Sequence, residues 1–254
     1  MTTIEECIQG VRTRIERACA QAGREPSSVA LLAVSKTFDA GAVRLAHGAR
    51  QLAFGENYIQ EAIDKMALLA DLPLIWHCIG PIQSNKTRLV AEHFDWAHTI
   101  ERLKTAERLS AQRPPGRAPL QVCIQVNIDG GANKSGVAPQ SALALARAVA
   151  QLPGIRLRGL MAIPEPSADF KLQLELHQRA ATLFKSIGSC GAAGLQDWDT
   201  LSLGMSADLE AAIMAGSTMV RVGSAIFGAR TAQDVIAAQA AIQTQADSDS
   251  GLRQ

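Results

Sequence analysis

The sequence lacks paired cysteines, a long apolar run and any large excess of charge, and each absence excludes a class of protein. The cysteines are widely spaced and form no Cys-x-x-Cys pair, which favours free thiols in a reducing compartment over a disulfide framework or a zinc site. They are Cys7, Cys19, Cys78, Cys123 and Cys190. No stretch approaches the roughly 18 consecutive apolar residues of a membrane span. The first residues are charged and amphipathic, unlike the apolar centre of a signal peptide. We expect a soluble, cytoplasmic protein without a bound metal.

The charge balance gives no reason to expect a polyanionic partner. The chain has 25 basic and 24 acidic residues, for a formal net charge of +1. Such a chain has no overall field that would draw it to nucleic acid or to an anionic membrane. Neither partner is expected.

The length and the apolar content suit one large α/β domain. The chain has 254 residues, of which 47% are hydrophobic, and an α/β barrel typically takes about 250 residues. The one segment that resembles a linker, residues 113–119 with three prolines, is too short to separate two domains. We therefore expect a single domain over residues 1–245 and a frayed polar tail over residues 246–254.

Short apolar runs alternate with helical patterns along the whole chain. The expected strands cover residues 29–35, 51–54, 74–79, 96–100, 120–127, 155–161, 200–203 and 219–222. The expected helices cover residues 4–22, 40–49, 58–69, 84–92, 101–112, 139–151, 168–187, 207–215 and 232–244. This alternation predicts a (β/α)₈ TIM barrel with an extra N-terminal helix, and it fits an open doubly wound sheet less well.

Lys36 follows the first apolar run and is the first candidate for a chemical role. Residues 29–35, Val-Ala-Leu-Leu-Ala-Val-Ser, have the composition of a strand buried on both faces. An amine whose neighbours exclude water tends to have a lowered pKa, and an uncharged amine can attack a carbonyl. The alternative is that this side chain reaches solvent at the end of the strand.

Two strand ends late in the chain have residues suited to bind a phosphate. The seventh expected strand leads into Gly204-Met205-Ser206, and the eighth leads into Gly223-Ser224. In α/β barrels the chemistry lies at the C-terminal ends of the strands, and a phosphate site often forms after the last two. Glycine lets the backbone approach an oxyanion, a serine hydroxyl donates to it, and a helix N-terminus adds positive charge. Each glycine can also mark a plain turn, and Ser206 a helix cap.

Arg221 occupies the eighth apolar strand, where a guanidinium needs acceptors in the barrel interior or in the helix layer. A structural ion pair is one interpretation, and contact with a ligand is the other. A Schiff-base lysine, a phosphate site and this arginine are joined by one ligand, pyridoxal 5′-phosphate (PLP).

Several motifs resemble those of the pyridoxal phosphate homeostasis protein family, which is similar to the N-terminal barrel domain of alanine racemase. The resemblance extends from about Ile4 to Arg230. The motifs are Gly55-Glu56-Asn57, residues 77–86 (HCIGPIQSNK), residues 158–161 (RGLM), residues 202–206 with Asp208, and residues 220–228 (VRVGSAIFG).

The resemblance implies a cofactor held as a Schiff base on Lys36, with Arg221 facing the pyridine nitrogen and Asn57 near the ring. It implies phosphate contacts from Ser206, Gly223 and Ser224. An arginine that stays protonated cannot give the pyridine nitrogen a proton, so the ring would be a weaker electron sink.

The sequence departs from the family pattern at two places. Family members often have Lys-Pro where this chain has Phe38-Asp39, so a secondary lysine role at position 38 is absent. Ser224 stands where threonine is frequent, and it preserves the hydroxyl donor.

The expected role is that of a carrier rather than an enzyme. By the same resemblance, full alanine racemases need a second β-rich domain and an acid or base opposite the lysine. This sequence ends soon after the eighth strand, and its one tyrosine, Tyr58, opens an expected helix. We expect a monomeric regulator of the cofactor and of amino-acid or keto-acid balance, with apo PLP-dependent enzymes as partners. Weak racemase-like activity remains compatible with this role. The alternatives are an amino-acid racemase and a lysine-dependent aldolase.

Four further residues near expected strand ends keep two interpretations each. His77 and Cys78 either reach the barrel mouth or pack in the core, because neighbouring strand residues point to opposite faces. Lys86 and Lys134 are either ordinary exposed lysines or help to hold an anionic cofactor.

Overall fold

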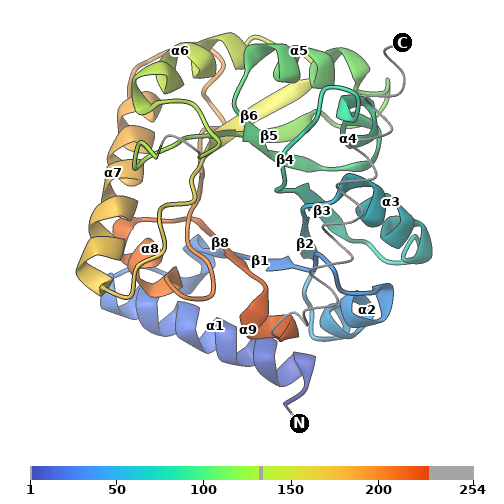
Figure 1. The fold of residues 1–254 in the computed structure, drawn as a ribbon, viewed down its shortest axis with the longest axis vertical. Coiled ribbons are helices and arrows are strands. Elements are labelled where there is room, and N and C mark those ends of the chain that lie inside the picture. The colour runs from blue at the N-terminus through green and yellow to red at the C-terminus, as the bar shows by residue number, and fades with distance from the viewer. Residues whose placement is uncertain (1, 132–133, 229–254) are drawn as a thin grey trace.

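Eight parallel strands close into a barrel in the computed structural model, which describes residues 2–131 and 134–228. Each strand pairs with its neighbours in chain order, and β8 returns to pair with β1 (Figure 1). The strands are β1 Ala30–Val34, β2 Ala53–Glu56, β3 Ile75–Cys78, β4 Trp96–Ile100, β5 Leu120–Gln125, β6 Ile155–Met161, β7 Thr200–Ser202 and β8 Met219–Val222. The predicted (β/α)₈ barrel is confirmed.

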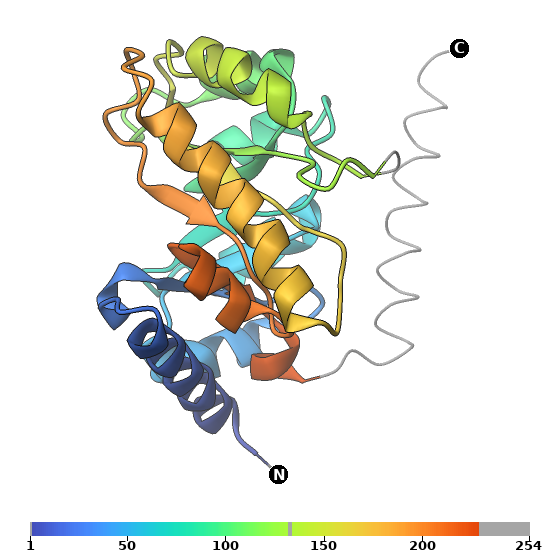
Figure 2. The same cartoon turned by 90° about the vertical axis from the view of Figure 1, so that its left-hand side faces the viewer.

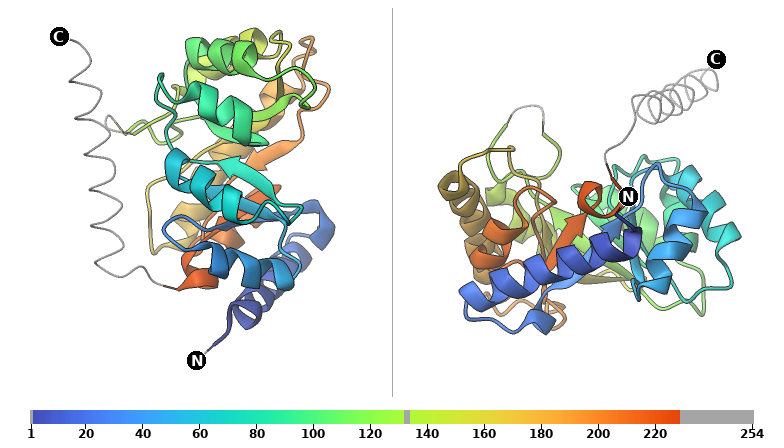
Figure 3. Two further views of the ribbon diagram at one scale, coloured as in Figure 1. Left: turned by 90° about the vertical axis from the view of Figure 1, so that its right-hand side faces the viewer. Right: turned by 90° about the horizontal axis from the view of Figure 1, so that it is seen from below.

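The helices surround the barrel and bury one face of each against it. They are α1 Ile4–Gln21, α2 Ala40–Gly48, α3 Ile59–Leu68, α4 Thr87–His93, α5 Leu103–Gln112, α6 Pro139–Val149, α7 Phe170–Gly188, α8 Leu209–Ala215 and α9 Ser224–Phe227, with the short 3₁₀ helix η1 Pro26–Ser28. Figure 2 shows α7 beside α8 on one flank, and Figure 3 shows α2, α3 and α4 on another. The extra N-terminal helix α1 packs on α2, α8 and α9.

The second strand begins two residues later than its apolar pattern predicts. The amide Nε2 of the buried Gln51 donates to the carbonyls of Leu31 and Ala53, both at 2.8 Å, so this residue holds the preceding turn. At its other end the strand extends two residues further than predicted, because Gly55 and Glu56 also pair with β3. Side-chain hydrogen bonding therefore overrides the apolar pattern here, and it brings Glu56 into the sheet.

Two helix predictions also need correction. The helix expected from residue 84 begins at Thr87, because Thr87 Oγ1 donates to the Ser84 carbonyl and residues 84–86 form a turn. The one-turn helix α9 after β8 was not predicted. The expected helix over residues 232–244 and the expected tail over residues 246–254 lie outside the described residues.

The described part of the chain lacks the structural features of two classes that the composition disfavours. Within residues 2–131 and 134–228, no helix combines the length and the apolar character that a membrane span requires. The same part of the chain contains no group of three or more His, Cys, Asp or Glu side chains arranged to hold a metal ion.

Gly159 lies where β5 and β6 shift register, and the close approach of β7 requires a glycine there. Its φ is +155°, and an added Cβ would lie 1.8 Å from the Thr200 carbonyl oxygen. We expect Gly159→Ala to lower the free energy of unfolding by about 3 kcal/mol, because backbone has to move. Urea unfolding measures the change.

The matched control is Gly10→Ala in the middle of α1, where an added Cβ meets no atom within 4 Å. Alanine favours helix by about 1 kcal/mol over glycine, so this variant should gain slightly in stability. Equal unfolding midpoints for the two variants would contradict the assigned packing at Gly159.

Candidate functional site

A cavity of about 340 Å³ opens at the C-terminal ends of the strands, and every predicted cofactor residue lines it. Those residues are Lys36, Asn57, Ser206, Arg221, Gly223 and Ser224. The remaining described lining residues are Val34, Phe38, Ile79, Ile163, Met205, Ala207 and Gly228. The position agrees with the rule that barrel chemistry lies at this end. Barrel closure thus brings together residues from both ends of the chain.

Lys36 lies in the turn after β1, two residues beyond the last strand residue. Val34 and Lys36 both border the cavity, as residues two apart on one face of an extended chain do. The turn is closed by a hydrogen bond of 3.1 Å from the Phe38 N–H to the Ser35 carbonyl. Next to Lys36, Thr37 has a φ of +69°, a conformation that β-branched residues rarely adopt. The Lys36 backbone is therefore part of a strained, hydrogen-bonded turn.

Arg221 points into the barrel interior and has oxygen acceptors rather than an ion-pair partner there. Its Nη1 donates to the carbonyl and the hydroxyl of Ser202, both at 2.7 Å, and its Nη2 donates to the Ala162 carbonyl at 3.0 Å. Burial lowers the pKa of Arg221 to about 10, against the attraction of Asp208, so the guanidinium stays charged at neutral pH. The structural ion pair considered from the sequence is not found among the described residues. Arg221 is instead a fixed cation at the cavity floor.

Two buried histidines continue this polar interior below the cavity. His98 Nδ1 lies 3.2 Å from Ser202 Oγ, and its Nε2 lies 3.0 Å from His77 Nδ1. Burial lowers the pKa of His77 to about 3. Burial, with smaller contributions from the neighbouring His77 and Arg221, lowers the pKa of His98 well below 6.5. Both rings are therefore neutral. His77 also stacks on Trp96 at 5.1 Å, so the packing interpretation of His77 holds in this structure.

The residues predicted to bind phosphate lie together where β7 and β8 end. Gly204 has a φ of +89°, and an added Cβ would lie 2.5 Å from Ala212 Cβ, so the turn before Ser206 needs glycine. The Ala225 N–H lies 3.4 Å from Ser206 Oγ, which links the two strand ends. Because α9 has four residues, its dipole is small. Individual hydroxyl and N–H groups are the donors that this corner offers an anion.

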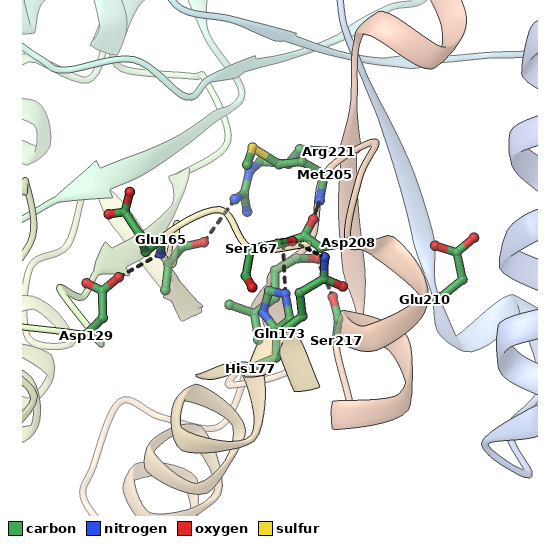
Figure 4. Close-up of polar contacts among 12 residues, drawn as sticks. Asp129, Glu165, Ser167, Gln173, His177, Met205, Asp208, Glu210, Ser217 and Arg221 are labelled. Carbon is green, nitrogen blue, oxygen red and sulfur yellow. Dashed lines mark hydrogen bonds and ion pairs between the residues drawn. The ribbon is translucent and has the colours of Figure 1, made fainter. Parts of the chain in front are cut away.

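The turn that carries Ser206 is supported by side-chain contacts that sequence reasoning did not identify. Asp208 accepts hydrogen bonds from the Met205 N–H at 2.6 Å and from His177 Nε2 on α7 at 3.0 Å (Figure 4). Arg14 on α1 donates to the Ser206 carbonyl at 2.9 Å and forms a bidentate pair with Glu210. The contacts of His177 and Arg14 have no local sequence signal, since their partners are distant along the chain, whereas Asp208 lies only three residues from Met205.

The other candidates lie away from the cavity. Lys134 pairs with Asp129 at 2.6 Å and with Glu165 at 2.8 Å. Lys86 precedes α4 and Tyr58 precedes α3, and neither borders the cavity. Cys78 is buried, and burial raises the pKa of its thiol to about 12, so it is a poor nucleophile. Within the described residues, Lys36 and Arg221 are the ionisable side chains that line the cavity.

The barrel, with its cavity at the C-terminal ends of the strands, is the fold of a broader class of proteins. Residues 9–231 match the family model described as the N-terminal domain of alanine racemase. The fold also resembles alanine racemase of Clostridium difficile with a TM-score of 0.65 at 16% identity, over 87% of this chain and 56% of that one. This similarity concerns the fold alone.

Nearer relatives define the particular family. A protein of Pseudomonas aeruginosa named pyridoxal phosphate homeostasis protein is 59% identical over 230 residues, which cover 91% of this chain and 97% of the relative. A protein of the same name in Escherichia coli is 52% identical over 237 residues, covering 91% and 98%. The structure of PipY of Synechococcus elongatus, with PLP bound, is 37% identical with a TM-score of 0.73, over 85% of this chain and 100% of that one. This chain belongs to the pyridoxal phosphate homeostasis protein family.

The contacts of Asp208 predict a pH-dependent contribution to stability. Burial disfavours its charged form most strongly, but hydrogen bonds from His177 and the Met205 N–H outweigh burial and lower the pKa of Asp208 below 3.8. A lowered folded pKa gives stability that is present at neutral pH and is lost as the pH falls through that pKa. We expect Asp208→Asn to cost about 1–2 kcal/mol near pH 7. Urea unfolding at neutral and acidic pH measures this cost.

The control is Asp64→Asn on the exposed face of α3, where the change should have little effect. The cost of Asp208→Asn should shrink as the pH falls. A cost that stays the same in acid would mean that the carboxylate charge is not what holds the Ser206 turn.

Proposed function

We propose that this chain binds PLP covalently through Lys36 and serves as a carrier and regulator of the cofactor and of amino-acid or keto-acid balance. The observation that carries the proposal is the cavity that Lys36 and Arg221 line together with the donors of Ser206, Gly223 and Ser224. Its volume of about 340 Å³ lies in the range of small-molecule sites. The relatives' names and the PLP bound in PipY support the same ligand.

The lining residues fit the chemical groups of the cofactor. The Lys36 amine suits an aldehyde, and the hydroxyls of Ser206 and Ser224 with the backbone at Gly223 suit a phosphate. We assign Asn57 to a place beside the ring and Arg221 to the pyridine nitrogen. When bound, PLP supplies a reactive aldehyde and a ring that can accept electron density. Arg221 donates hydrogen bonds to Ser202 and Ala162 and keeps its charge, so it would not transfer a proton to the pyridine nitrogen.

The set of ionisable groups favours a carrier over a racemase. Racemisation needs acid and base groups on opposite faces of the substrate. Among the described lining residues, Lys36 and Arg221 are ionisable, and Arg221 is held by hydrogen bonds at the cavity floor. The names of the curated relatives point the same way. We propose that the chain has no robust turnover, and weak racemase-like activity is compatible with this role.

The proposal extends to the setting of the protein. We propose a cytoplasmic monomer that exchanges PLP with apo PLP-dependent enzymes and uses neither nucleic acid, membrane nor metal as a partner. We also propose one PLP-binding domain over residues 1–245, followed by a tail over residues 246–254. The tail lies outside the described residues.

Removal of the Lys36 amine tests the ligand and its attachment together. Purified protein reconstituted with PLP should be yellow, and borohydride reduction should fix the cofactor on Lys36. We expect Lys36→Ala to lose the absorption band and the trapped adduct, because no amine remains in the described lining of the cavity to bond the aldehyde. A visible spectrum and peptide mass spectrometry measure both effects.

The control is Lys104→Ala, which removes an exposed amine on α5. This variant should keep the colour and the adduct. If Lys36→Ala bound the cofactor in the same spectral form as the unaltered protein, the assignment of Lys36 would be wrong.

If this protein carries PLP, it should transfer the cofactor to an apo enzyme without catalysing a reaction of its own. We expect the loaded protein to lose its colour when an apo PLP-dependent enzyme is added and the acceptor to gain activity. The measurement is the visible spectrum of this protein together with the activity of the acceptor.

Solvent deuterium incorporation at Cα, measured for each enantiomer of a panel of amino acids, separates the carrier from the racemase. Rapid exchange with turnover would contradict the carrier role. Borohydride trapping of a sugar phosphate by cofactor-free protein would instead favour the lysine-dependent aldolase.

A further inference from the structure

Three charged side chains outside the cavity surround the turn that presents Lys36. Glu56 ends β2, and Glu61 and Lys65 lie one helical turn apart on α3. Glu56 is 1% exposed and Lys65 is 5% exposed, so this pair is removed from water. A buried ion pair is a weak source of stability, because desolvation offsets its attraction. A role in fixing geometry explains its presence better.

Lys65 holds the residue that precedes Lys36. Its Nζ donates to the Ser35 carbonyl at 2.9 Å, to Glu56 Oε1 at 2.7 Å and to Glu61 Oε1 at 3.1 Å. The hydroxyl of Ser35 donates to the same oxygen of Glu56 at 2.6 Å. An ammonium group has three protons to donate, and all three have acceptors here. Lys65 is therefore committed to structure and is not a second amine for an aldehyde.

Glu61 holds the residue that follows Lys36. Its Oε1 accepts the Thr37 N–H at 2.8 Å. Thr37 has a φ of +69°, and its hydroxyl is buried without a hydrogen-bond partner. A non-glycine residue in this region costs on the order of 1–3 kcal/mol and persists when its surroundings enforce it. The bond to Glu61 is one such constraint.

We propose that Glu56, Glu61 and Lys65 are positioning residues for Lys36. Together they hold Ser35 and Thr37, so that the side chain between them enters the cavity in a fixed direction. None of the three borders the cavity, so they act on a ligand through Lys36. The inference rests on the proposed attachment of PLP to Lys36.

The test separates attachment from binding by using two ligands on the full-length protein. One is PLP, whose aldehyde can bond Lys36, and the other is pyridoxine 5′-phosphate, which has no aldehyde. Glu61→Leu removes the acceptor for the Thr37 N–H, and it suits the purpose because the Glu61 side chain is 34% exposed. We expect the rate of PLP attachment to fall by about tenfold or more, the scale of a lost charged hydrogen bond. The affinity for pyridoxine 5′-phosphate should stay unchanged.

Three further variants complete the experiment. Glu61→Gln keeps an oxygen acceptor and should retain most of the attachment rate. Glu56→Gln combined with Lys65→Met leaves no unpaired buried charge and should slow attachment as Glu61→Leu does. Lys104→Met, an exposed change on α5, should have no effect. Thermal melting of the cofactor-free proteins checks that each variant is folded.

The outcomes are distinct. Attachment at the unaltered rate in Glu61→Leu and in the double variant would overturn the positioning role alone. An equal loss of pyridoxine 5′-phosphate affinity would also overturn it, because the effect would then be a general disturbance of the cavity. Failure of the unaltered protein to attach PLP at Lys36 would overturn the proposed function itself.

Discussion

The pairing of β1 with β8 is the contact on which the site depends. Leu32 aligns with Arg221 and Ala33 aligns with Val222, so the first and last strands of the barrel run in register. Lys36 leaves one of these strands, and Gly223 and Ser224 leave the other. These residues come from opposite ends of the sequence, and without this closure the Lys36 amine would lie apart from the residues proposed to bind phosphate. Closure of the barrel thus places residues that are distant in sequence around one cavity of about 340 Å³.

The interior beneath the cavity is polar, and its hydrogen bonds are the reason that a buried guanidinium is tolerated. Arg221 donates to Ser202 and Ala162, and Ser202 in turn contacts His98. These neutral partners accept hydrogen bonds from both terminal nitrogens of Arg221 without neutralising the charge. The result is a rigid cation at the cavity floor. The turn carrying Lys36 is held in a different way, by the buried pair Glu56–Lys65 and by the partly exposed Glu61. Two independent supports therefore orient the two ionisable residues of the described lining.

Much of the fold and of the candidate site was predictable from local patterns. The strands 96–100, 155–161 and 219–222 have the predicted bounds, because their apolar runs are flanked by clear turn or helix signals. The helix after Asp39 begins where its capping side chain predicts. The predicted start of β2 was wrong because Gln51 uses its side chain against the backbone, which an apolar pattern does not reveal. The contact between Asp208 and His177 escaped prediction because the two residues are 31 positions apart in sequence.

The sequence by itself determined the alternation of strands and helices, the buried strand before Lys36, and the small and hydroxyl residues after the last two strands. These are local properties, set by periodicity and turn chemistry. Tertiary structure alone decided that Arg221 would meet carbonyl and hydroxyl oxygens instead of a carboxylate. It also decided that Glu61 and Lys65 on α3 would reach the residues on either side of Lys36. Such contacts depend on the direction in which each side chain leaves a closed barrel, and direction is a property of the packed fold.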